Sequence, residues 1–492
     1  MSQIKKLAGQ TAYYGISSIL GRVLNFLLLP IWTARLIPEE YGNVTYLYSL
    51  VGISLIVYTY GMETAFFRFS RKIDPKEAYN NAASSILLTS LVFSTAIFLF
   101  SSSLSNLLGE GIRPEYVKFM AAILFIDAII AIPFAKLRLE ERALKFALIK
   151  IGVITLTIVL NLLLIIVSPD IIAGKYLLSL QGFVSKFYTE GIGVSYIFIA
   201  NLLANIFYLP LLWKEFTGIH LKLNKEVLKP MFTYGWPIFF MGLGGIFNEQ
   251  GYSLIMKAIS GSESLGIFSG AVKLSVFMML GIQAFRYAAE PFFFNHAENK
   301  EAPALFARIM HYFVVFNIFI LLAVALNASL LGDLFLRQPA YREALYVLPV
   351  LLVAKLFYGI YVNLSVWFKI IDKTIYGTYF ALIGALITLI GNLLLIPLIG
   401  FYGSAITSLL CYFTMSIICY YQGRKMFKVP YQFKILLVYL IIALITIYTV
   451  DFVEIDNQWL SYGFDLFVTA IFAVFMYLKE GKSLRYKTIE NQ

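Results

Sequence analysis

Charge is scarce in this chain, and so are cysteine and histidine. Only 14% of the 492 residues are charged and 60% are hydrophobic, whereas soluble globular domains have about 25% charged and about 45–50% apolar residues. This composition excludes a water-soluble enzyme and a disordered protein. Two cysteines are too few for a secreted disulfide scaffold, and three scattered histidines offer no credible metal site.

Motifs for soluble chemistry are also missing. The segment nearest to a P-loop is Gly481-Lys482-Ser483, and it has Met476 where the motif needs glycine. The chain therefore has no expected ATPase activity. No Ser-His-Asp arrangement can be proposed, so we expect a protein that is not an enzyme and has no cofactor beyond a coupling Na⁺ or H⁺.

Apolar runs, in contrast, recur along almost the whole chain. A membrane-spanning helix needs about 20 apolar residues, and fourteen runs of this kind occupy most of the sequence. The sequence thus predicts an all-α polytopic membrane protein of about fourteen transmembrane helices. They are expected at residues 10–34, 43–69, 81–108, 117–137, 146–168, 192–214, 231–258, 264–295, 303–330, 341–368, 374–398, 401–423, 431–451 and 459–478.

The distribution of cations predicts the orientation of these spans. With a cytoplasmic N-terminus, the inside segments hold 28 of the 39 Lys and Arg, and the outside segments hold 8. Cytoplasmic connectors carry the excess of Lys and Arg in membrane proteins, so both termini are expected in the cytoplasm. The same rule explains the net charge of +11. No basic stripe is long enough for a row of phosphates, and nucleic acid is not an expected partner.

The two halves of the chain resemble each other. Residues 40–50 line up with 264–274, and Asn161-Leu162-Leu163-Leu164 lines up with Asn392-Leu393-Leu394-Leu395. Residues 191–195 line up with 400–404 if the connector that follows Pro169 is an insertion in the first half. A six-helix repeat keeps its membrane orientation, as in parallel-repeat transporters. We expect two six-helix lobes around a central cavity (1–215 and 216–425), followed by two additional helices and a short cytoplasmic tail (426–492).

Four segments carry a resemblance to a known family: 21–24, 34–42, 61–69 and 392–405, the last reading NLLLIPLIGFYGSA. With them, the chain resembles the polysaccharide flippase branch of the multidrug/oligosaccharidyl-lipid/polysaccharide (MOP) exporter superfamily. Peptidoglycan-precursor flippases of that superfamily also carry an arginine where Arg22 stands. They follow it with an Arg-Asp pair, and here those positions read Leu27-Leu28-Leu29, which argues against the peptidoglycan branch.

The resemblance implies a flippase that moves undecaprenyl-pyrophosphate-linked oligosaccharide, an O-antigen or other polysaccharide repeat unit, across a bacterial inner membrane. It implies a lipid-linked substrate, membrane lipids as surroundings, and a polysaccharide polymerase with its chain-length machinery as partners. Two other functions remain open at this point. One is a cation-coupled multidrug antiporter, and the other is an intramembrane sugar polymerase or ligase, for which the outside connectors are short and poor in candidate acids and bases.

Three cations lie within the expected spans: Arg22, Lys273 and Lys355. On translocon scales each costs about 2.5–3.5 kcal/mol at a helix centre, so each needs water, a counter-ion or an anionic ligand. A pyrophosphate suits both the guanidinium fork and the lysine point charge. The alternative is a salt bridge within the protein.

Three acids are the candidates for that alternative: Glu63, Asp127 and Glu249. Asp127 and Glu249 lie within spans, where they could bind a coupling proton or sodium ion or act as counter-ions. Glu63 lies nearer the cytoplasmic end of its span, and Arg68 is its local cation five residues further on.

Overall fold

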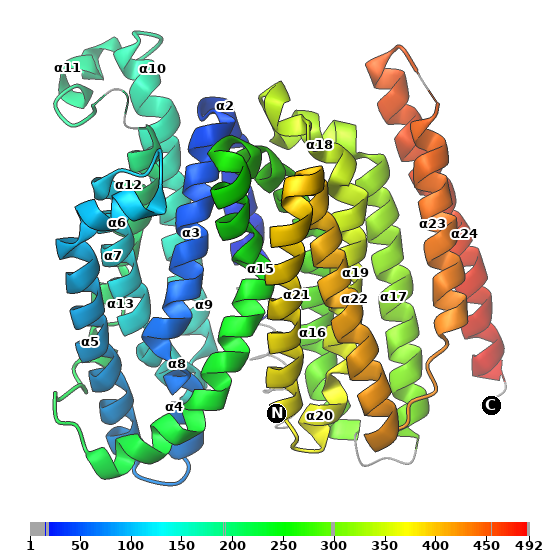
Figure 1. Ribbon diagram of the computed structural model, residues 1–492, viewed down its shortest axis with the longest axis horizontal. Coiled ribbons are helices and arrows are strands. Elements are labelled where there is room, and N and C mark those ends of the chain that lie inside the picture. The colour runs from blue at the N-terminus through cyan, green and yellow to red at the C-terminus, as the bar shows by residue number, and fades with distance from the viewer. Residues whose placement is uncertain are drawn as a thin grey trace. The chain divides into compact units, whose positions relative to one another are not determined.

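The structure is a computed structural model, and it describes residues 15, 19–189, 191, 193–296, 301–453 and 455–489. Every regular element in these residues is a helix, and none is a strand (Figure 1). The expected all-α fold class is therefore confirmed.

Two compact units divide the chain. The first consists of Met1–Ser269 with Lys373–Cys411, and the second of Gly270–Asp372 with Tyr412–Gln492. The first unit holds α2 (Leu28–Arg35), α3 (Pro38–Thr59), α4 (Met62–Phe69), α5 (Pro75–Leu99), α6 (Ser101–Leu108), α7 (Pro114–Ile129), α8 (Ala131–Leu139), α9 (Ala143–Asn161), the π-helix η1 (Leu162–Val167), α10 (Ser168–Ile172), the 3₁₀-helix η2 (Leu178–Leu180), α11 (Gln181–Val184), α12 (Gly193–Ile206), α13 (Tyr208–Leu211), α14 (Trp213–Phe216), most of α15 (Lys225–Leu274), α21 (Ile375–Ile399) and the start of α22 (Phe401–Met426).

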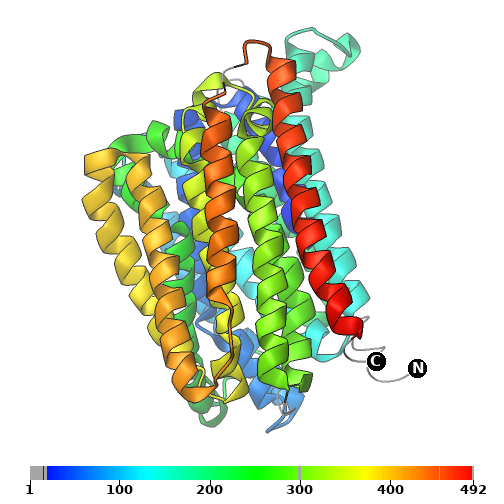
Figure 2. The ribbon, with the colours of Figure 1, turned by 90° about the vertical axis from the view of Figure 1, so that its right-hand side faces the viewer.

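The second unit holds the remaining helices. They are α16 (Val276–His296), α17 (Ala302–Leu326), α18 (Ala328–Phe335), the 3₁₀-helices η3 (Pro339–Arg342) and η4 (Leu345–Val347), α19 (Leu348–Leu364), α20 (Val366–Ile370), α23 (Phe433–Asp451) and α24 (Gln458–Ile489). The last two pack against α17 (Figure 2). His311 of α17 contacts Glu480 of α24 at 3.0 Å, and Tyr439 of α23 donates to the same carboxylate at 2.6 Å.

These units are defined by compactness, whereas the lobes expected from the sequence are defined by repetition. The boundaries 1–215, 216–425 and 426–492 therefore stay a prediction.

The described helices make this a multi-pass membrane protein. Eleven of them, or twelve if the bent pair of α15 and α16 counts as one span, are long and apolar enough to cross a membrane. Fourteen spans are not reached for two reasons. The first expected span, 10–34, lies partly outside the described residues, and the expected spans 231–258 and 264–295 fall on the bent pair. The number fourteen therefore stays a prediction.

Several spans begin earlier than the hydropathy pattern predicts. Helices α3, α5 and α7 start at Pro38, Pro75 and Pro114, whereas their spans were expected from 43, 81 and 117. Proline suits the first helical position because it lacks the N–H that would have no partner there. The first turns that follow are polar, and acids in them favour a helix N-terminus. Hydropathy alone assigns these turns to connectors.

Helix α15 consists of two segments joined at Gly261, which has φ +82° and ψ 175°. Its 50 residues would measure roughly 75 Å as a straight helix, more than twice the roughly 30 Å of a bilayer core. Glycine tolerates this backbone conformation because it has no Cβ. The break falls where the sequence predicts a connector between two spans.

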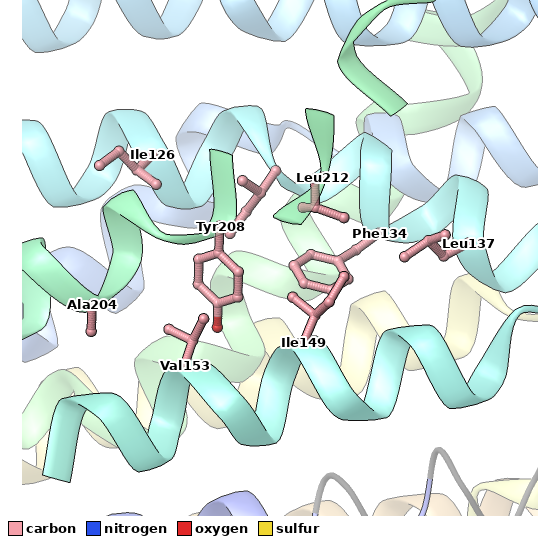
Figure 3. Packing of buried hydrophobic residues seen from close by; sticks show 9 residues of the cluster. Ile126, Phe134, Leu137, Ile149, Val153, Ala204, Tyr208 and Leu212 are labelled. Carbon is pink, nitrogen blue, oxygen red and sulfur yellow. The ribbon is translucent and has the colours of Figure 1, made fainter. Parts of the chain in front are cut away.

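An apolar core holds the helices of the first unit together. Its buried residues come from α7, α8, α9, α12 and the segment after it, and Phe134 and Tyr208 lie at its centre with their ring centroids 5.5 Å apart at 86° (Figure 3). Lipid tails are as apolar as this core, so close packing rather than the hydrophobic effect stabilises it. Ile126 and Ile149 belong to it, and this packing positions the neighbouring charged residues Asp127 and Lys150.

Candidate functional site

Asp127 lies within α7 and has a polar partner on another helix. Its Oδ1 accepts a hydrogen bond from Nδ2 of Asn205 on α12 at 2.9 Å. An electrostatic interaction also links Asp127 to Lys150 of α9. The ammonium of Lys150 lies 5.0 Å from the ring centroid of Phe134 and 5.5 Å from that of Phe146. The carboxylate of Asp127 inside its span therefore has both a hydrogen-bond donor and a nearby cation within the first unit.

Glu63 forms an ion pair with Arg138 of α8. The interpretation of Arg68 as its partner is wrong, because residues five apart do not share a helix face. The Arg68 guanidinium instead lies 4.3 Å from the ring centroid of Tyr234. The guanidinium of Arg138 also lies 5.1 Å from the ring centroid of Phe67.

Lys150 interacts electrostatically with Arg138, Asp127 and Glu63 together. These four residues form what we call the charge cluster. It contains two acids and two bases, and it joins α4, α7, α8 and α9. Sequence reasoning missed Arg138 and Lys150 because both were counted with the cytoplasmic connectors. The signal available was the position of Lys150, which is the fifth residue of the expected span 146–168.

Arg22 lies in the helical residues 19–26, just before a turn at Leu27. It is partly exposed, and no ion pair or hydrogen bond joins its side chain to another described residue. Its neighbour Gly21 packs against α9, since a Cβ there would lie 2.9 Å from Cδ1 of Ile154. The candidate counter-ions Glu63 and Asp127 have other partners within the first unit. The structure therefore provides no described salt bridge for Arg22.

The other three predicted site residues are placed as follows. Glu249 lies exposed on α15, next to Asn248, whose Nδ2 donates to the Ala381 carbonyl at 3.2 Å. Lys273 lies exposed near the end of α15, in the second unit. Lys355 lies partly buried on α19, with its ammonium 5.7 Å from the ring centroid of Tyr412. A common role of these residues with Arg22 or Asp127 stays a prediction.

Helices α3 and α15 cross at an unusually close contact. A Cβ added to Gly42 would lie 1.8 Å from the carbonyl oxygen of Ser262, and one added to Gly266 would lie 1.8 Å from that of Pro38. Gly42 and Gly266 are 224 residues apart, as are Pro38 and Ser262, and 224 is also the offset of the predicted repeat of 40–50 at 264–274. The crossing thus has the two-fold symmetry that the repeat predicts, and we call it the glycine crossing.

Polar groups reinforce the glycine crossing. Oδ1 of Asn43 accepts hydrogen bonds from Nζ of Lys257 at 2.5 Å and from Oγ of Ser262 at 2.8 Å. Lys257 also donates to the Glu110 carbonyl at 3.1 Å. In the predicted topology this is the outside end of α3.

The opposite end of α3 also packs on α15. A Cβ on Gly61 would lie 2.5 Å from the Gly235 carbonyl oxygen, and Tyr60 stacks on Phe232 with centroids 5.2 Å apart. Helix α3 is therefore held against α15 at both ends.

Comparison of the sequence with known families gives one result that decides the family. The profile of the polysaccharide biosynthesis protein family matches residues 33–286. The chain belongs to this family. Comparison with curated proteins finds no match.

Within the described residues, no group of three or more His, Cys, Asp or Glu is placed to hold a metal ion.

Three solved structures that share the fold with this chain are a flippase and two transporters. The lipid II flippase MurJ, in an inward closed conformation, has a TM-score of 0.71 at 14% identity, with 94% of this chain and 98% of MurJ covered. An inward-facing multidrug resistance MATE family transporter of the MOP superfamily has a TM-score of 0.61 at 18% identity, covering 82% and 94%. A MOP superfamily transporter from Pyrococcus furiosus has a TM-score of 0.57 at 18% identity, covering 85% and 95%. Family and fold together confirm the resemblance to the polysaccharide branch of the MOP superfamily.

Proposed function

We propose that this protein flips an undecaprenyl-pyrophosphate-linked oligosaccharide from the cytoplasmic to the outer leaflet of a bacterial inner membrane. The observation that carries the proposal is the family match over residues 33–286, because polysaccharide biosynthesis needs sugar units moved across the membrane. The fold supports it, since a lipid II flippase shares it over 94% of this chain. An O-antigen or other polysaccharide repeat unit is the proposed cargo, and both termini are proposed to lie in the cytoplasm. A polymerase and its chain-length machinery are the proposed partners.

Arg22 is the residue that we propose to bind the pyrophosphate, together with Lys273 and Lys355. Arg22 is partly exposed and has no ion pair among the described residues, so its guanidinium keeps its donors for a ligand. Its planar fork matches two phosphate oxygens at once. The two lysines supply point charges to the same anionic group.

Transport would proceed by alternating access, in which the glycine crossing opens the path to the outside. Gly42 and Gly266 allow the backbones of α3 and α15 to meet directly, and the Asn43–Lys257 hydrogen bond closes the same end. Asp127 or Glu249 would bind a coupling H⁺ or Na⁺. Asp127 lies inside a span within the charge cluster, so a change in its protonation would alter the attraction between α7 and α9.

A second candidate is a cation-coupled multidrug antiporter, because MATE transporters share the fold. A pocket for organic cations would want acidic walls, whereas the chain places Arg22, Lys273 and Lys355 within its helical segments. The charge of these residues favours an anionic substrate.

Native mass spectrometry of the purified protein tests the choice. The protein is offered equal amounts of an undecaprenyl-pyrophosphate oligosaccharide and of a lipophilic organic cation. We expect the lipid-linked sugar to stay bound and the cation to be absent from the complex. Retention of the cation alone would favour the antiporter and contradict the flippase.

A further inference from the structure

The connector between α10 and α12, residues 173–189, exposes six large apolar side chains. The second half of the chain passes from α21 to α22 through Gly400 alone, so this connector is an addition to the first half. It contains the short helices η2 and α11 and projects at one end of the first unit (Figure 1). Exposed apolar side chains on it are Tyr176, Leu177, Leu178, Leu180, Phe183 and Phe187, with exposed fractions between 40% and 73%.

Specific contacts hold both ends of the connector. At its start, Asp170 receives two hydrogen bonds from Arg35, each of 2.9 Å, and one of 2.8 Å from Lys175. At its end, Tyr188 stacks on Tyr196 with ring centroids 4.6 Å apart. The chain is therefore anchored, and its apolar side chains face outward as part of a defined arrangement.

Further contacts order the middle of the connector. Nε2 of Gln181 donates to the Ile172 carbonyl at 2.8 Å. Phe183 and Phe187 lie with ring centroids 5.2 Å apart, as expected for residues four apart on a helical turn. Both rings are exposed, at 63% and 73%.

The helix before the connector places it at the level of the lipid headgroups. The span Ala143–Ile172 has 30 residues, which corresponds to a length of about 45 Å, equal to a bilayer with its headgroup regions at about 40–45 Å. If the span starts at one headgroup layer, Ile172 lies in the other. The connector therefore begins at the outer surface of the membrane in the predicted topology.

The apolar surface of that helix continues into the connector. Val159, Leu162 and Leu163 are 43%, 39% and 44% exposed along α9 and η1, as lipid-facing side chains are. The connector adds Lys175 and Lys186, and residues 173–189 contain no acid. Aromatic rings together with lysines are typical of segments that lie in a membrane interface, where apolar groups enter the acyl boundary and cations meet phosphates.

We propose that residues 173–189 form an interfacial anchor that inserts Phe183 and Phe187 into the outer leaflet. The anchor lies in the lipid headgroup region, where Lys186 meets the lipid phosphates, while Lys175 holds Asp170 at the start of the connector. The anchor fixes the outer end of α9 and α10 at one depth and is independent of the transported substrate.

Spin-label depth measurements test the anchor. Cys411 and Cys419 are buried and are replaced by alanine, and single cysteines are introduced as Phe183→Cys and Phe187→Cys. Val159→Cys is the lipid-facing control, and Asp456→Cys, exposed in another connector, is the aqueous control. The labelled proteins are reconstituted into phosphatidylethanolamine and phosphatidylglycerol vesicles at about one protein per vesicle. Power saturation then compares relaxation by oxygen with relaxation by a water-soluble nickel chelate.

We expect both connector labels to show an oxygen-to-nickel ratio severalfold above that of Asp456→Cys and below that of Val159→Cys. A ratio equal to that of Asp456→Cys at both positions would place the connector in water and overturn the anchor. A raised ratio that appears only when vesicles hold many copies would show that another copy of the chain, and not lipid, covers the rings.

Discussion

At the residue scale, the charged side chains within spans divide into two kinds. Asp127 and Glu63 have partners on neighbouring helices, Asn205 and Arg138. Arg22 has no such described partner. Charges in a membrane are costly unless they are paired, hydrated or bound to a ligand, so the first kind stabilises the first unit and the second kind is suited to a substrate.

Substitution of Arg22 tests its proposed role. Hydrogen bonds to charged groups contribute about 1.5–3 kcal/mol, so Arg22→Ala should weaken binding of the lipid-linked pyrophosphate roughly tenfold to a hundredfold. Arg22→Lys keeps the charge but loses the fork, and it should bind with intermediate affinity. The measurement is the dissociation constant of purified variants whose thermal unfolding matches that of the wild type. Unchanged binding by Arg22→Ala would remove Arg22 from the site.

Two substitutions of Asp127 separate a coupling role from a structural one. Asp127→Asn keeps an acceptor for Asn205 but has no titratable group, so transport should lose its dependence on an ion gradient. Asp127→Ala leaves the Asn205 amide without its acceptor, at a cost of about 1–3 kcal/mol, and should lower the thermal unfolding temperature. Transport assays with and without a proton or sodium gradient measure the first effect. Gradient dependence that persists in Asp127→Asn would exclude a coupling role.

The sequence predicts which charges lie inside spans but not which partners they have. A lone Asp127 in an apolar run is evident from hydropathy. Its partner Asn205 is 78 residues away, and Arg138 is 75 residues from Glu63. Helical periodicity describes only neighbours three and four positions apart, so pairs between helices depend on packing that no single sequence shows.

At the element scale, several predicted spans match observed helices because glycine or polar residues mark the ends of the apolar runs. The expected spans 374–398 and 431–451 correspond to Ile375–Ile399 and Phe433–Asp451, because glycine or a polar connector bounds each apolar run. The π-helix η1 was not predicted. Its start is marked by Asn161, whose Oδ1 accepts a hydrogen bond from Nε1 of Trp32 at 2.9 Å, and such a contact between helices has no signature in hydropathy.

The glycine crossing gives a prediction for two elements. Gly42→Ala places a Cβ 1.8 Å from the Ser262 carbonyl oxygen, so α3 and α15 must move apart. Overpacking of this kind costs about 1–3 kcal/mol, and the thermal unfolding temperature should fall. Gly245→Ala on α15 is the matched control, because a Cβ there meets nothing within 4 Å. It should leave stability unchanged or raise it by up to about 1 kcal/mol, since alanine favours helix. Equal stability of the two variants would contradict the close crossing.

At the scale of the whole molecule, the cation asymmetry predicts which connectors face outward. Single cysteines at Lys175 and Asp456 should react with a membrane-impermeant maleimide in intact cells, and cysteines at Lys76 and Lys225 should not. All four positions are exposed, and the native Cys411 and Cys419 are buried, so background labelling should be low. Labelling of the cysteine at Lys225 from outside would reverse the topology.

Transport by the purified protein in liposomes tests the central claim most directly. A fluorescent undecaprenyl-pyrophosphate oligosaccharide is placed in one leaflet, and its appearance in the other is followed by quenching, with efflux of an organic cation measured in parallel vesicles. We expect translocation of the lipid-linked sugar well above that in empty liposomes, its loss in Arg22→Ala, and no efflux of the cation. Efflux of the cation without movement of the lipid-linked sugar would contradict the proposed flippase.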